Sequence, residues 1–171
     1  MAQANPRLIE ALRITARRLD SGADYRWTHM GRCNCGHLAQ TVTRKSSEEL
    51  HRIALQKAGD WSQQAVDHCP TSGLPMDHVI ESLLDLGLNR DDLCALERLS
   101  DRRILKRLPV GERRLDKRTQ KHVVLYLRTW ADWLEERFMA TREVPAFLPD
   151  SLPGEAAEEM LVPVRRRPDT A

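Results

Sequence analysis

Three cysteines and two histidines fall in two short clusters whose side chains could do chemistry. The first cluster is Cys33-Asn34-Cys35-Gly36-His37, and the second is His68-Cys69-Pro70. Thiols and imidazoles bind soft metal ions, and they also serve in redox and nucleophilic reactions. Glycine, proline and small polar residues flank both clusters, so the side chains have room to converge. The sequence therefore places one candidate site at these two segments.

The first hypothesis for this site is a metal centre. Structural zinc takes four thiolate or imidazole ligands in a tetrahedron. The sequence offers one such set: Cys33, Cys35, His37 and Cys69. Further candidates are His29, His68 and Cys94. A single residue separates the first two cysteines, whereas zinc-binding pairs usually have two to four residues between them. We predict a zinc-type site with a structural or regulatory role.

A second hypothesis uses the same residues for thiol chemistry. If a helix begins near Gly36, its N-terminal amides and its dipole would lower the pKa of Cys33 and Cys35. A disulfide across one intervening residue would be strained and easily reduced. Cys69 could alternatively act as a nucleophile, although the adjacent His68 would rarely align with it as a base. The sequence is therefore also compatible with a thiol redox enzyme or with an enzyme that uses a cysteine nucleophile.

The cysteines could instead belong to the core, because cysteine is among the most buried residue types. Gly36 would then allow two helices to approach closely, and Asn34 would cap the following helix. Cys94 fits this interpretation best, since several leucines accompany it on one predicted helix. The clustered cysteines could therefore either form a functional site or pack in the core.

Charge suggests a different function. The net charge is only +2, but residues 47–101 are strongly acidic and residues 102–121 are strongly basic. The basic side chains are Arg102, Arg103, Lys106, Arg107, Arg113, Arg114, Lys117, Arg118 and Lys121. They could bind a polyanion, either a nucleic acid or an acidic protein, although no aromatic residues interleave them for base stacking. Alternatively, they lie on solvated faces and pair with the acidic residues of the same domain.

Composition indicates a helical protein from a reducing compartment. Apolar residues make up 41% and charged residues 30% of 171 residues, and glycine and aromatic residues are scarce. The first residues lack the apolar core of a signal peptide, and no stretch approaches the roughly twenty apolar residues of a membrane span. We expect a cytoplasmic protein, in which four cysteines imply thiols, a metal or a transient disulfide.

Apolar spacing and capping residues predict helices along most of the chain. Their expected ranges are 6–20, 36–42, 46–58, 61–66, 76–86, 90–99, 100–108 and 119–140. The longest has apolar residues Val123, Leu127, Trp130, Leu134 and Phe138 on one face. This face would close the core, or it could form the seam of a homodimer.

These elements predict one compact all-α domain over residues 5–142. Residues 143–171 contain five prolines and an acidic excess, which indicates an extension that wraps the domain or is disordered. The two helices joined at Gly87 have the outline of a helix-turn-helix, but Asp91, Asp92 and Glu97 on the second would repel phosphates. We therefore expect a plain helical hairpin there.

Overall fold

The computed structural model describes residues 1–27, 29, 31–56 and 77–142, and all regular structure within these ranges is helical. The elements are α1 (Pro6–Asp20), α2 (Asn34–Thr43), α3 (Ser47–Gln56), α4 (Asp77–Asp85), α5 (Arg90–Arg98), α6 (Arg102–Leu105), the short 3-10 helix η1 (Val110–Glu112) and α7 (Gln120–Arg142). The expected all-α class with a long C-terminal helix is thus confirmed. The helix expected at 61–66 and the extension at 143–171 lie outside the described residues.

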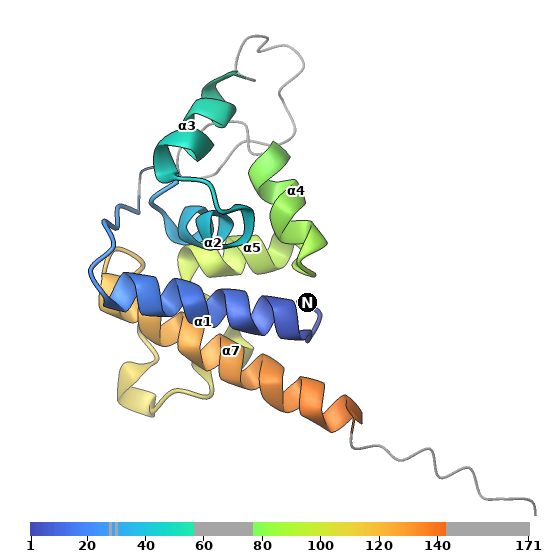
Figure 1. Cartoon of the computed structure of the whole chain (residues 1–171). Coiled ribbons are helices and arrows are strands. Elements are labelled where there is room, and N and C mark those ends of the chain that lie inside the picture. The colour runs from blue at the N-terminus through green and yellow to red at the C-terminus, as the bar shows by residue number, and fades with distance from the viewer. Residues whose placement is uncertain (28, 30, 57–76, 143–171) are drawn as a thin grey trace, which may run out of the picture.

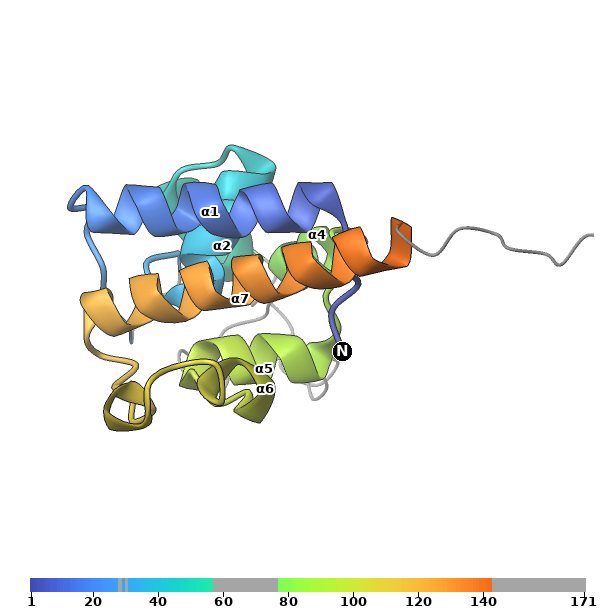
Figure 2. The ribbon, with the colours of Figure 1, turned by 90° about the horizontal axis from the view of Figure 1, so that it is seen from below.

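Helices α1 and α7 form an antiparallel pair that runs along one side of the molecule (Figures 1 and 2). Gln120, at the start of α7, donates to the carbonyl of Leu19 at the end of α1. At the opposite end, Arg137 contacts the sulfur of Met1. The pair also carries a bidentate ion pair between Arg13 and Glu135. These contacts fix the direction and the register of the two helices.

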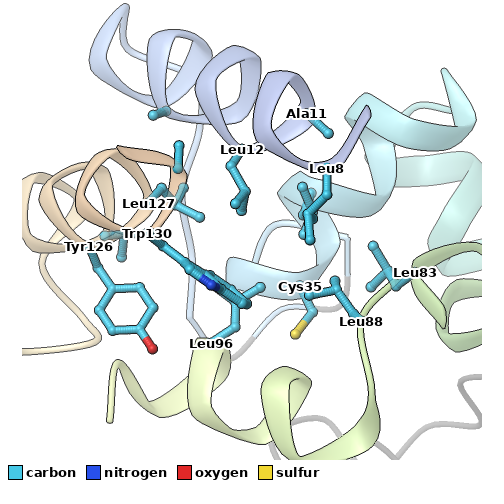
Figure 3. Close-up of a cluster of buried hydrophobic side chains, with 14 of the residues drawn as sticks. Leu8, Ala11, Leu12, Cys35, Leu83, Leu88, Leu96, Tyr126, Leu127 and Trp130 are labelled. Carbon is cyan, nitrogen blue, oxygen red and sulfur yellow. The ribbon is translucent and has the colours of Figure 1, made fainter. Parts of the chain in front are cut away.

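Helix α2 lies at the centre, where it contacts α1, α3, α4 and α5. The core between these helices and α7 is aliphatic apart from Tyr126, Trp130 and the thiols of Cys33 and Cys35 (Figure 3). Tyr126 and Trp130 meet edge to face, with ring centroids 6.0 Å apart. Burial of such large rings is the dominant favourable contribution to folding.

Three expectations about local structure need correction. Cys94 was expected in the core but is exposed, because it occupies the outward face of α5. Helix α2 begins at Asn34 rather than Gly36, so Cys33 is its N-cap residue. Helix α6 spans only Arg102–Leu105 of the expected 100–108, where Lys106 ends the helix before Pro109.

A close approach of two backbone segments positions the start of α2. A Cβ atom placed on Gly36 would lie 2.5 Å from the carbonyl carbon of Gly31. Gly31 itself has a φ of +86° and packs against the backbone of Ser47. Gly36 therefore allows α2 to contact the preceding turn, not a second helix. None of the helices in the described ranges is long and apolar enough to cross a membrane.

Candidate functional site

The first turn of α2 carries both clustered cysteines in buried positions. Cys33 is 3% exposed and Cys35 is 4% exposed. The thiol of Cys35 donates to the carbonyl of Leu93 on α5 at 3.6 Å, and it lies among the leucines of the core (Figure 3). This is the environment of a core thiol, which is the third of the interpretations that the sequence left open. Access of a substrate or a thiol reagent to either sulfur would require local opening.

A buried polar cluster connects this turn to α5. The Cys33 side chain makes no capping hydrogen bond, and the carboxyl of Glu97 instead accepts from the backbone N–H of Cys35 at 3.2 Å. The amide of Asn34 donates to the carbonyls of Leu96 and Glu97. A carboxyl 62 positions away in the sequence thus takes the place of the local side chain that usually caps the start of a helix.

Tyr25 completes this cluster. Its hydroxyl lies 2.7 Å from Oδ1 of Asn34 and also contacts the carbonyl of Lys117. Burial, followed by the neighbouring Glu97 carboxylate, raises the pKa of Tyr25 above its usual value. The phenol therefore stays protonated and acts as a hydrogen-bond donor near neutral pH. This contact also joins the start of α2 to the basic segment at residues 102–121.

His37 lies on the same helix but faces another direction. Its ring stacks on Tyr25, and Nε2 lies 3.2 Å from the carbonyl of Asp24. Nδ1 is buried and has no hydrogen-bond partner in the described part of the chain. Burial, with a smaller effect of the positive charge of Arg18, lowers the pKa of His37 to about 4. A neutral ring that donates through Nε2 carries its lone pair on Nδ1.

The four expected metal ligands are therefore not seen together. Cys35 faces α5, His37 faces Asp24, and Cys69 lies outside the described residues. Within the described ranges, no group of three or more histidine, cysteine, aspartate or glutamate residues could hold a metal ion. The zinc hypothesis stays a prediction, because its fourth ligand is not among the described residues.

Sequence reasoning missed a pair of imidazoles close to α2. His29, in the turn before Cys33, and His51 of α3 have ring centroids 5.1 Å apart. Nδ1 of His51 is buried, and no described residue forms a hydrogen bond with it. The spacing of 22 positions between the two histidines gives no local motif, so only the fold could reveal their proximity.

The basic segment, residues 102–121, forms a lobe on the side of the molecule opposite α3 and α4 (Figure 1). Some of its cations serve the fold itself. Arg103 pairs with Asp101 and lies 4.0 Å from the buried Asp92, and Arg107 pairs with Glu136 of α7. Arg113 donates to the carbonyls of Leu108 and Lys106. The expected pairing with the acidic middle of the chain therefore involves Arg103.

An aromatic side chain from a distant segment also supports this lobe. Nζ of Lys117 lies 4.0 Å from the ring centroid of Trp27, and the guanidinium of Arg118 lies 5.7 Å from it. Trp27 is anchored by donating from Nε1 to the carbonyl of Glu97. The sequence shows no aromatic residue within the lobe, so this cation–π contact could not be anticipated.

The remaining cations of the lobe are free for a partner. Their side chains are exposed and make no ion pair or hydrogen bond with any described residue: Arg102, Lys106, Arg114 and Lys121. Arg102 and Lys106 are four positions apart at α6, which places them on one face. Comparison with known proteins gives no guide to their role: the chain matches no protein-family model, no curated protein and no solved structure.

Proposed function

We propose that this protein is a helical interaction module that binds a polyanionic partner through the basic lobe at residues 102–121. The observation that carries the proposal is a set of exposed cations whose side chains make no ion pair or hydrogen bond with a described residue: Arg102, Lys106, Arg114 and Lys121. Such cations attract phosphate or carboxylate arrays over roughly 10 Å at moderate salt. The backbone that carries these cations is held in place, because Arg113 donates to the carbonyl of Leu108 and Lys117 packs on the Trp27 ring.

The expected binding is electrostatic and independent of base sequence. Trp27 is covered by Lys117, so its ring supports a cation instead of stacking on a base. A phosphate backbone and a run of glutamates therefore present the same chemistry to the lobe. The affinity should fall steeply as the salt concentration rises, because binding releases counterions from the polyanion.

Anisotropy of labelled duplex DNA and of labelled poly-glutamate, measured from about 50 to about 200 mM salt, tests this function. The variant replaces Arg102, Lys106 and Arg114 with glutamine. Loss of three phosphate contacts should reduce the salt slope for duplex DNA by about 2.7, at roughly 0.9 per contact.

The matched control replaces three other exposed arginines with glutamine: Arg17, Arg52 and Arg128. It removes the same charge from other faces and should retain most of the affinity. Equal losses in the two variants would show that net charge, rather than the lobe, governs binding. Absence of binding to both probes at low salt would contradict the proposal itself.

A zinc-type site at Cys33, Cys35, His37 and Cys69 is a second candidate, which the ring of His37 favours. Histidine ligands usually donate one ring N–H to a carbonyl and coordinate through the other nitrogen. His37 has this arrangement, with Nε2 at Asp24 and a buried Nδ1 that has no hydrogen-bond partner among the described residues. Cys33 precedes it by one helical turn, a spacing that places two ligands on one face.

Elemental analysis of purified protein together with a free-thiol count tests this second candidate. The site predicts stoichiometric zinc, protected thiols and a lower melting temperature after chelation. Cys69→Ser should abolish the metal content, whereas Cys94→Ser, at the exposed cysteine, should not change it. Metal-free protein with an unchanged melting temperature in chelator would refute this candidate without affecting the basic lobe.

A further inference from the structure

A continuous groove runs along the outer side of α1, between this helix and the C-terminal end of α2. Three depressions of about 270, 420 and 510 Å³ compose it. The first and second share Pro6, Arg7 and Leu86. The second and third share Ile14, Thr41 and Arg44. Because neighbouring depressions have walls in common, they form one surface feature, which we call the α1–α2 groove.

The floor of the α1–α2 groove is partly apolar. Ile14 and Val42 are half-buried and line its middle section, next to the buried Ala11. Polar groups dominate the rim. The groove extends along α1 from Arg7 to Arg18, a distance of about 16 Å at the usual helical rise. An amphipathic segment of roughly ten to thirteen helical residues would match this length.

The two ends of the α1–α2 groove differ in charge. At the end beside α2, Arg18, Arg44 and Lys45 outnumber one carboxylate, Glu49. Glu49 already accepts from the backbone N–H of Ser46, so it competes little for these cations. At the other end, the lining holds one cation and one carboxylate, Arg7 and Asp85. A ligand with carboxylates near its distal end would therefore complement the groove.

We propose that residues 150–162 of the same chain occupy the α1–α2 groove. Residues 143–162 contain five carboxylates and no lysine or arginine. The spacing of Leu152, Ala156 and Met160 would place three apolar side chains on one face of a helix, with Glu155, Glu158 and Glu159 beside them. Apolar contacts would lie over Ile14 and Val42, and the three glutamates would meet the basic end.

The chain reaches the groove over a short path. Helix α7 ends at Arg142, and Arg137, five positions earlier, contacts Met1. The backbone of Gln3 then bonds to Gly87, which lines the first section of the groove. Residues 143–149 could span up to about 23 Å when extended. The end of α7 and the start of the groove are thus close enough for an intramolecular ligand.

Amide NMR spectra of the full chain test this proposal through a charge swap. One variant carries Glu155→Lys, Glu158→Lys and Glu159→Lys, a second carries Arg44→Glu and Lys45→Glu, and a third combines all five changes. Relative to the unaltered chain, the first two should shift the amide signals of residues 14 and 41–42, and the combined variant should move them back. A control pair, Arg102→Glu and Lys106→Glu, should leave these signals in place.

Two results would overturn the proposal. Unchanged signals of residues 14 and 41–42 in the variant altered at Glu155, Glu158 and Glu159 would show that the segment does not contact the groove. If dilution of the protein abolishes the difference in these signals between the unaltered chain and this variant, the groove binds the segment of a second copy. Signals of the buried Leu12 and Leu127 report in every sample whether the core is intact. The outcome is independent of whether the basic lobe binds a polyanion.

Discussion

The neutral, buried imidazole of His37 predicts that the protein loses stability in mild acid. The ring is 2% exposed, stacks on Tyr25 and donates through Nε2 to the carbonyl of Asp24. Its pKa falls from 6.5 to about 4 on folding, chiefly because burial disfavours the charged form. In the unfolded chain the same ring takes up a proton near its ordinary pKa.

The sign and the size of the effect follow from this difference. Between pH 6.5 and about 4, the unfolded state binds a proton that the folded state does not, so protons favour unfolding. The stability that depends on neutral His37 is complete above pH 6.5 and is lost as the pH falls towards 4. Lowering the pH from about 7.5 to about 4.5 should therefore remove about 2.5 kcal/mol from the free energy of unfolding.

Urea unfolding of the unaltered protein and of His37→Gln across this pH range measures the effect. Glutamine retains an N–H donor for Asp24 but does not take up a proton in this pH range. The free energy of unfolding that is lost on acidification should therefore be smaller by about 2.5 kcal/mol in this variant. His122→Gln, in the first turn of α7, is the matched control and should retain the steep dependence. Equal pH dependence in the unaltered protein and His37→Gln would refute the assignment of a buried neutral imidazole.

Three further predictions concern the first turn of α2 and its surroundings. Gly36→Ala should lower the free energy of unfolding by about 2 kcal/mol because its Cβ would meet backbone atoms, whereas Gly111→Ala, in open space, should not; urea unfolding compares them. Glu97→Ala should cost about 1–3 kcal/mol in the same assay, since it leaves the backbone N–H of Cys35 buried without its acceptor. In native protein, Cys94→Ser should remove one fast-reacting thiol, and a thiol count that stays unchanged would contradict the exposed position of Cys94.

The helices were predictable where local signals agreed. Asn5 and Pro6 predict the start of α1, because asparagine is a common helix cap and proline has a φ suited to the first turn. In the structure, the Asn5 side chain accepts from the backbone N–H of Leu8, as expected. The regular apolar spacing from Val123 to Leu134 identifies α7 in the same way. Such signals act over a single turn, so the sequence displays them directly.

The environment of the cysteines was not predictable to the same degree, because it depends on contacts between distant segments. Glu97 and Cys35 are hydrogen-bonded although they lie 62 positions apart in the sequence. Trp27 and Lys117 are likewise in contact although they belong to distant segments of the chain. The error at Cys94 has a related cause. Its leucine neighbours show that α5 has an apolar face, but Cys94 lies one position beyond Leu93 and so points outward.

The polar cluster at α2 bears on which of the three sequence hypotheses for the cysteines is strongest. A reactive thiolate needs an electropositive, partly exposed environment. The N-terminal amides of α2 supply positive potential, but one of them is already bonded to the Glu97 carboxyl, and Tyr25 is tied to the same turn through Asn34. Cys33 and Cys35 are also shielded from solvent. These features oppose a catalytic thiolate more than they oppose a core thiol or a metal ligand, since neither of those requires exposure to solvent.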